Sequence, residues 1–140
     1  MTFPDPAEVL PHSPPAVLVE RVLAFDGDTV VCLARIGADS PFVSDGRAPA
    51  LVALEMAAQA AAMLPQRGDG TVGPLRSGYL VRVRDVTLSR ADLPAGAALV
   101  VTARRTDATG PLGVFAVDVR LDGEPVLAGT LATMRAHGGP

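Results

Sequence analysis

Most apolar residues of this chain fall into short runs typical of strands, but one stretch differs. Residues 49–64, Pro-Ala-Leu-Val-Ala-Leu-Glu-Met-Ala-Ala-Gln-Ala-Ala-Ala-Met-Leu, form the longest apolar run and consist mostly of strong helix formers. The run begins at Pro49 and stops before Pro65, which is typical of a helix. A helix that is apolar on every side has no face for solvent, so the run predicts one helix surrounded by the rest of the fold.

Glu55 and Gln59 are the only polar residues of this run. Their spacing of four places them on one helix face, a turn apart. A carboxylate among Leu54, Met56 and Ala58 is poorly solvated, which favours its neutral form and makes Glu55 a candidate proton donor or acceptor. The alternative is a structural role, in which the carboxylate is hydrogen-bonded to Gln59 or to the backbone and only fixes packing.

Strand patterns lie on both sides of this helix. Residues 16–25 and 29–36 are rich in Val and Leu and are separated by the turn Asp26-Gly27, which predicts an antiparallel hairpin. Residues 37–48 are predicted to be a loop, and the glycine-rich residues 66–78 a long connection. Further strands are predicted at 79–88, 99–105, 112–121 and 126–134, and in 112–121 alternation places Phe115, Val117, Val119 and Leu121 on one inner face. In 79–88, the phase of the apolar residues slips between Val83 and Val86, which predicts a β-bulge.

The order of these elements predicts the fold class. Two strands, one long helix and then about four strands do not alternate as they would in a parallel α/β sheet. We therefore expect an α+β hot-dog fold, an antiparallel sheet of about six strands wrapped around one long central helix. A chain of 140 residues suits a single domain, so we expect residues 1–140 to form one, with ends frayed at about 1–9 and 136–140. Such a sheet leaves an edge uncovered, which favours pairing with a second hot-dog chain.

Composition excludes several classes of function. The net charge of −3 and a pI near 5.2 argue against a broad nucleic-acid surface. Cys32 is the only cysteine and lies in an apolar run, which predicts an ordinary core thiol. We see no metal-ligand cluster or nucleotide-binding loop and expect no metal and no cofactor. We also see no secretory signal, and the apolar helix is too short to span a bilayer, so we expect a cytoplasmic protein.

Two motifs resemble the β-hydroxyacyl-acyl-carrier-protein dehydratases. Residues 10–22, Leu-Pro-His-Ser-Pro-Pro-Ala-Val-Leu-Val-Glu-Arg-Val, are similar to the opening of these proteins, and residues 54–59, Leu-Glu-Met-Ala-Ala-Gln, to their helix motif. The resemblance covers nearly the whole chain. It implies that Glu55 takes the place of the family's catalytic acid and Gln59 that of the amide one turn later. It also implies 3-hydroxyacyl thioesters of fatty-acid, polyene or polyketide-type lipid biosynthesis as substrates, carried by acyl carrier protein or coenzyme A, and a homodimer or heterodimer.

The chain departs from that family before the helix. Where the family carries Gly-His-Phe-Pro, whose histidine is the base, residues 41–49 read Pro-Phe-Val-Ser-Asp-Gly-Arg-Ala-Pro. In this the chain is similar to the predicted dehydratases associated with aryl-polyene-type lipid clusters. Three candidates remain for the base: His12, Asp45, and Glu55 itself acting twice in sequence. His12 has the alternative role of fixing the Pro-rich segment, and Asp45 that of forming a turn beside Gly46.

The resemblance also implies residues that bind substrate and carrier. Phe42, Val43, Pro49 and Gln59 are predicted to contact the acyl chain, although they equally suit a plain core. Arg82 and Arg84 alternate with Val81 and Val83 and therefore share a strand face. They are predicted to meet the phosphate of a phosphopantetheine arm or an acidic carrier protein, since guanidinium groups suit both. The alternative is a solvated strand face.

Two other functions remain open on the sequence. The absent loop histidine suits a catalytically silent hot-dog subunit that binds acyl chains or completes a heterodimer with an active partner. It also suits an acyl thioesterase, because some hot-dog enzymes use a helix carboxylate with water. The products separate these readings, since a dehydratase yields an enoyl thioester and a thioesterase yields a free acid and a thiol.

Overall fold

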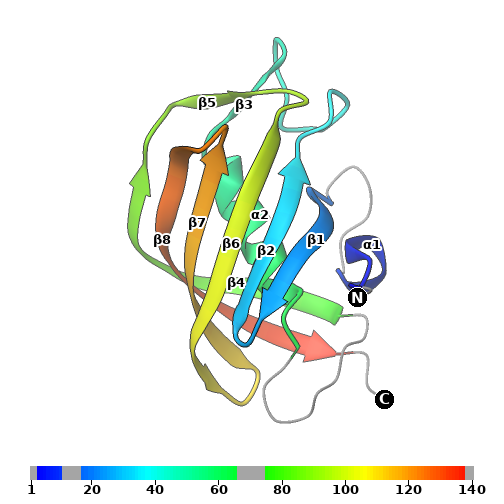
Figure 1. Cartoon of the computed structure of the whole chain (residues 1–140), viewed down its shortest axis with the longest axis vertical. Helices are drawn as coiled ribbons and strands as arrows, with labels where there is room; N and C mark the ends of the chain where they lie inside the picture. The colour runs from blue at the N-terminus through cyan, green and yellow to red at the C-terminus, as the bar shows by residue number, and fades with distance from the viewer. Residues whose placement is uncertain (1–2, 11–16, 66–74, 138–140) are drawn as a thin grey trace.

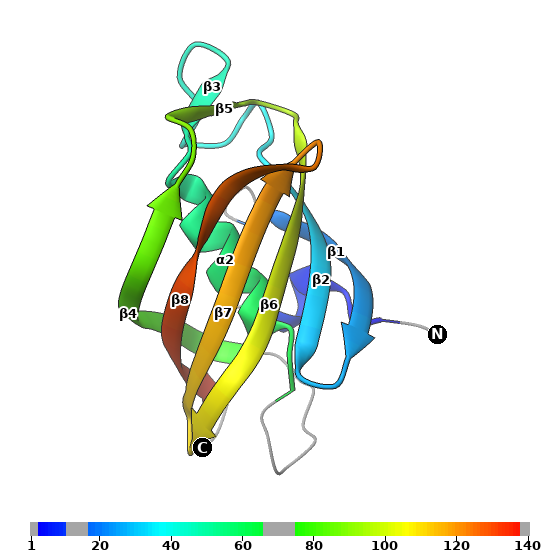
Figure 2. The ribbon, with the colours of Figure 1, turned by 60° about the vertical axis from the view of Figure 1, so that its left-hand side comes forward.

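The computed structural model describes residues 3–10, 17–65 and 75–137, and a six-stranded antiparallel sheet curls around one helix at its centre (Figure 1, Figure 2). The helix is α2 (Val52–Ala62). The spatial order of the strands is β1-β2-β6-β7-β8-β4. Their bounds are β1 Val19–Asp26, β2 Thr29–Arg35, β4 Leu75–Leu88, β6 Ala98–Thr109, β7 Leu112–Leu121 and β8 Glu124–His137. This confirms the hot-dog fold predicted from the order of elements.

The concave face of the sheet holds the core. β7 turns Phe115, Val117, Val119 and Leu121 inward, as its alternation predicts, and all four are buried. α2 packs against this face and contacts β1, β2, β6, β7 and β8. Six of its eleven residues are alanines, whose side chains are single methyl groups, and this lets the strands approach it closely. The sheet therefore holds the helix through the face that packs against it.

Cys32 belongs to this core and is fully buried on β2. Burial raises the pKa of its thiol to about 12, because the thiolate would lose its hydration. We expect native Cys32 to resist a thiol reagent at pH 8 and to react only when the protein unfolds. Labelling followed with and without denaturant tests this, and a Val100→Cys variant, with its thiol at an exposed position on β6, is the matched control. Equal labelling rates at the two native sites would contradict it.

α2 differs from its prediction in two ways. It is shorter than 49–64, because Pro49 belongs to a strand. The turns on either side of the helix also have hydrogen bonds that span three residues and not four, such as Ala53 N–H to the Ala50 carbonyl at 2.9 Å. The expectation of a helix surrounded on all sides is also wrong. Leu51 is 55% exposed and Leu54 and Glu55 are half-buried, so one face of the helix is open. The sheet covers only the opposite face.

The β-bulge predicted in β4 is confirmed. The pairing of β4 with β8 shifts between Arg84 and Thr87, and Asp85 has a positive φ of 54°. At this point Gly129 of β8 lies against Val86. A Cβ atom on Gly129 would lie 2.8 Å from Val86 Cγ2, 3.1 Å from Val86 Cα and 3.2 Å from the Arg84 carbonyl oxygen. The bulge therefore requires glycine on the neighbouring strand.

We expect Gly129→Ala to lower the free energy of unfolding by about 1–3 kcal/mol, because two of the three clashes are with backbone that no rotamer change can move. Denaturant unfolding measures the change. Ala128→Ser is the matched control, since it adds one atom at the adjacent half-buried position. A Gly129→Ala variant as stable as the wild type would show that the bulge does not hold Val86 this tightly.

Three further elements were not predicted. A short ribbon of β3 (Arg47–Pro49) and β5 (Asp92–Pro94) caps the end of the fold where α2 begins (Figure 2). A four-residue helix, α1 (Pro6–Val9), is capped by the Asp5 side chain and buries Val9. This helix lies within the start that is expected to fray. At the other end β8 continues to residue 137. The expected fraying of the ends stays a prediction.

Candidate functional site

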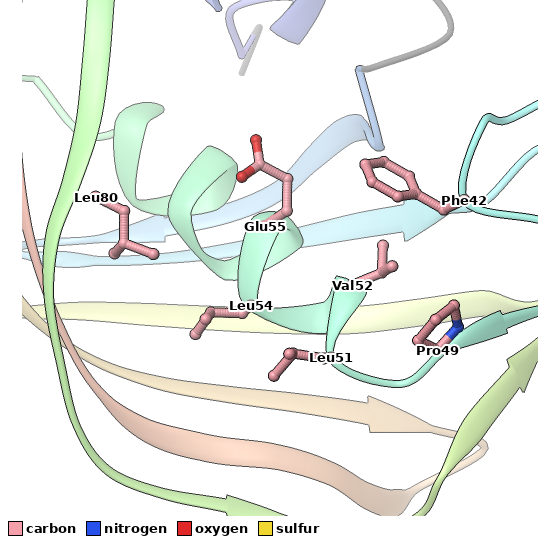
Figure 3. A pocket seen from close by; sticks show the side chains of 7 residues that line it. All are labelled: Phe42, Pro49, Leu51, Val52, Leu54, Glu55 and Leu80. Atoms are coloured by element: carbon pink, nitrogen blue, oxygen red, sulfur yellow. The ribbon is translucent and has the colours of Figure 1, made fainter.

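A groove of about 460 Å³ opens on the uncovered face of α2 (Figure 3). This volume suits a small ligand or an acyl chain of moderate length. Among the described residues of the lining, Glu55 alone is ionisable and the others are apolar. The lining residues are Phe42, Pro49, Leu51, Val52, Leu54, Glu55 and Leu80.

Three parts of the chain build this groove. Phe42 comes from the loop before β3, Leu80 from the edge strand β4, and the remainder from Pro49 and the first turn of α2. Figure 3 shows the Glu55 carboxylate between the Phe42 ring on one side and Leu80 on the other. A carboxylate at the centre of an apolar groove can donate or accept a proton from a bound ligand whose remaining surface is apolar.

Gln59 lies one turn after Glu55 and is 1% exposed. Its Oε1 accepts hydrogen bonds from the backbone N–H groups of Leu18 at 2.8 Å and Val19 at 3.2 Å. Its Nε2 donates to Glu55 Oε1 at 3.2 Å. A hydrogen bond between Glu55 and Gln59 is one of the alternatives that the sequence offers, and the structure contains it. Gln59 is not among the groove-lining residues, so its position does not support the predicted contact with an acyl chain.

The loop before β3 is held at both ends. Ser40 Oγ accepts a hydrogen bond from the Phe42 backbone N–H at 3.2 Å. Asp45 and Gly46 both have positive φ angles, 53° and 74°, and form the tight turn between Ser44 and Arg47. Asp45 therefore has the turn-forming role given above as its alternative. It is exposed and is not among the described groove-lining residues.

An ion pair fixes the β3–β5 ribbon next to this loop. Arg47 Nε donates to Asp92 Oδ1 at 2.7 Å, and Arg47 NH2 approaches the same oxygen at 2.5 Å. The hydrogen bond from Arg47 holds the pKa of Asp92 below its usual value. Because both side chains are about half exposed, this pair contributes little to stability but orients the ribbon that carries Pro49 into the groove.

Val43, Arg82 and Arg84 are not among the described residues that line the groove. Val43 packs against the core. Arg82 and Arg84 pair with Ala132 and Thr130 on β8, which alternate with buried Leu131, so both arginines lie on the outer face of the sheet. They are exposed there and do not border the groove. His12 falls within 11–16, which lie outside the described residues.

Some groove residues were missed by sequence reasoning. Leu51, Val52 and Leu54 belong to the apolar run, and although the resemblance implies that an apolar side of this helix lines an acyl tunnel, the sequence did not single out these residues. Leu80 could not be singled out from the sequence, because it is one of several apolar residues on β4 and nothing distinguishes it from the others. Only the fold brings it beside Glu55.

The described part of the chain holds neither a metal-ligand cluster nor a membrane-spanning helix. Within 3–10, 17–65 and 75–137, no three His, Cys, Asp or Glu side chains gather as they would around a metal ion. No helix in this part of the chain is long and apolar enough to cross a membrane.

Sequence comparison identifies related dehydratases. The model of the ApeP-like family, described as ApeP dehydratase, matches residues 4–138. The 3-hydroxyacyl-[acyl-carrier-protein] dehydratase FabZ of Streptococcus pneumoniae is 30% identical over 129 residues, covering 89% of this chain and 90% of that protein. An uncharacterized thioester dehydrase of Halalkalibacterium halodurans is 32% identical over 87 residues. That match spans 59% of this chain and about half of the relative, 55%.

Structural comparison gives a consistent result. A chain of the dehydratase heterocomplex ApeI:P from Xenorhabdus doucetiae superposes with a TM-score of 0.83 and 25% identity, covering 97% of this chain and 93% of that chain. A hypothetical thioesterase from Streptococcus pneumoniae, solved with coenzyme A, has a TM-score of 0.58 and 12% identity, with 86% and 88% coverage. At that level of identity the second likeness concerns the fold alone.

Proposed function

Since this chain belongs to the ApeP-like dehydratases, we propose that it dehydrates 3-hydroxyacyl thioesters of the kind used in aryl-polyene biosynthesis, with Glu55 as the general acid or base. The observation that carries the proposal is the position of Glu55, the one ionisable group among the described residues that line the apolar groove. The 30% identity to a FabZ dehydratase over nearly the whole chain supports the same chemistry.

The reaction requires two proton transfers. A base removes a proton from the carbon next to the thioester carbonyl, the bond from the neighbouring carbon to its hydroxyl breaks, and the hydroxyl takes up a proton and leaves as water. A double bond forms between the two carbons. Glu55 as a carboxylic acid would donate the proton to the leaving hydroxyl. As a carboxylate, it would accept the first proton and deliver it in the second step.

The groove also suits the charge that develops on the thioester oxygen. α2 begins at the groove, where Leu51 and Val52 belong to the lining. The partial positive charge at a helix N-terminus stabilises a negative oxygen, so a thioester carbonyl placed against the first turn of α2 would be polarised toward the enolate. The acyl chain would then extend along the apolar wall of Phe42 and Leu80.

We further propose that a second hot-dog chain joins at β4. Among the described residues, β4 pairs only with β8 and leaves its other edge open. It also carries a cluster of exposed large apolar side chains: Leu80, Val81, Val83 and Leu88. An exposed apolar edge strand is typical of a surface that another strand covers. The related ApeI:P complex, a dehydratase heterocomplex, supports an ApeI-type hot-dog protein as the partner, which would then also close the groove at Leu80.

The test is product analysis. The purified chain, alone and with the ApeI-type protein of the same organism, is incubated with 3-hydroxyacyl and trans-2-enoyl thioesters of both carrier protein and coenzyme A. Mass spectrometry should detect reversible loss of water from the hydroxyacyl thioester. Release of free acid would instead identify a thioesterase. No conversion by the chain or by the pair, together with acyl binding, would identify a silent acyl-binding subunit.

A further inference from the structure

The open edge strand β4 carries two arginines that no neighbouring carboxylate neutralises. Arg82 and Arg84 are exposed and pair with Ala132 and Thr130 of β8 on the outer face of the sheet. Neither arginine has an ion-pair partner within the described part of the chain. The ion pairs there use other arginines, namely Arg35, Arg47, Arg105 and Arg120. The positive charge on the outer side of β4 therefore faces solvent.

Asp85 is the one carboxylate between Leu80 and Leu88, and it lies at the β-bulge. Its positive φ of 54° and the shift of the ladder between Arg84 and Thr87 take it out of the regular alternation. Two arginines and one aspartate leave this stretch with one net positive charge. Figure 2 shows β4 as the outermost strand, so this charge lies at the open edge of the sheet.

Self-association at β4 would bring these charges together. Two copies joined antiparallel into one continuous sheet are related by a two-fold axis perpendicular to that sheet, so outward side chains of one copy meet outward side chains of the other. Across such a junction, facing Cβ atoms are about 5 Å apart and diagonal ones about 7–8 Å. Arg82 and Arg84 of the two copies would face one another wherever the strands overlap at this stretch, and facing like charges weaken strand pairing.

We infer that Arg82 and Arg84 select the partner at β4, because they disfavour a second copy of this chain and favour a chain with carboxylates on the outward face of its own edge strand. The inference rests on the proposed joining of a second hot-dog chain at β4. The exposed apolar side chains of β4 offer area that any such chain could cover, whereas complementary charge distinguishes one chain from another. Val81 and Val83 therefore account for binding, and the two arginines for the choice of partner.

A charge-reversed copy of this chain, Arg82→Glu with Arg84→Glu, is the probe. Its edge strand still repels itself but presents the opposite charge to the wild-type strand. The mixed dimer of wild type and charge-reversed copy should have a Kd at least about tenfold lower than either protein has with itself. Native mass spectrometry of the mixture separates the three dimers. Arg21→Glu with Arg104→Glu is the matched control, since it makes the same change in charge at exposed arginines on β1 and β6.

The effect of salt gives a second readout, because salt screens charges at an exposed surface. Raising NaCl from about 0.05 to about 0.5 M should strengthen self-association of the wild type and weaken the mixed dimer. A change in shape or apolar area would move both in the same direction, so opposite signs identify the charges. Arg82→Gln with Arg84→Gln, which removes the charge without reversing it, should strengthen self-association by about three- to tenfold.

The complex with the ApeI-type protein should respond in the same way. Charge reversal at Arg82 and Arg84 should weaken it by at least about tenfold, while the matched control binds like the wild type. Circular dichroism and Tm should be unchanged in every variant, because the substituted side chains are exposed. A complex that forms equally well with the wild type and the charge-reversed copy would overturn the inference.

The remaining outcomes separate this inference from the proposed function. Mixed dimers no more abundant than random pairing gives would overturn the selection by charge and leave the interface at β4 in place. Charge reversal that impairs only the binding of an acidic carrier protein would also overturn it and would assign the arginines to the carrier. Should Val81→Lys with Val83→Lys leave every complex intact, the proposed joining at β4 fails and the inference fails with it. Dehydration is tested independently, by the products of the wild type and Glu55→Gln.

Discussion

Replacing Glu55 with Gln should lower the turnover of 3-hydroxyacyl thioesters by about 10²–10⁴-fold, which is the usual contribution of a positioned acid or base. Gln has nearly the same shape and can still hydrogen-bond to Gln59, but it cannot donate or accept the proton that the reaction moves. The other described residues of the lining are apolar, so none of them can take over this role. Stopped assays with both carrier types, analysed by mass spectrometry, measure the loss.

The same variant should still bind acyl thioesters, because the apolar walls that hold the chain are unchanged. Binding is measured by titration with an enoyl thioester. Glu124→Gln, which makes the same substitution at the exposed turn between β7 and β8, is the matched control and should retain full turnover. Wild-type turnover in Glu55→Gln would remove Glu55 from the chemistry and leave the base and acid to be found elsewhere.

A double substitution on β4, Val81→Lys with Val83→Lys, should weaken binding of the ApeI-type partner by at least about 100-fold. Both valines lie on the open edge strand, 51% and 40% exposed, where a partner would cover them. Two lysines there would have to be desolvated on association, and charge on an edge strand also opposes strand pairing. Sedimentation velocity of the mixed chains measures the complex.

The fold of the single chain should survive this change, since both side chains already face solvent. Circular dichroism and Tm check that it does. Val100→Lys on β6 is the matched control, because Val100 is 42% exposed but lies within the sheet and not at its edge. A complex that tolerates the β4 pair as well as it tolerates Val100→Lys would place the interface elsewhere.

Several features of the fold follow from the sequence, because they depend on local periodicity. Alternation along 112–121 correctly assigned Phe115 and its neighbours to the core, and the phase slip near Val86 correctly located the bulge. One long apolar run among strands was enough to predict a sheet around a central helix. The short elements β3, β5 and α1 could not be predicted, because a segment of three or four residues is too short to show a helix or strand periodicity.

The candidate site was predictable only in part. The spacing of Glu55 and Gln59 placed them on one helix face, and this alone singled out the carboxylate. The open face of α2 was not predictable, because an apolar helix looks the same in sequence whether strands or a ligand groove cover it. The sequence likewise put Arg82 and Arg84 on one strand face but could not say which face of the sheet this is, and the ladder with β8 places them on the outer face.

By itself the sequence determined the order of the elements, the core face of each long strand and the pairing of Glu55 with Gln59, since each depends on residues within a few positions of one another. Only the tertiary structure decided that Leu80 forms a wall beside Glu55 and that the backbone of Leu18 and Val19 orients Gln59. These contacts join segments about 25 to 40 residues apart, and the curl of the sheet around α2, which no local pattern encodes, brings them together.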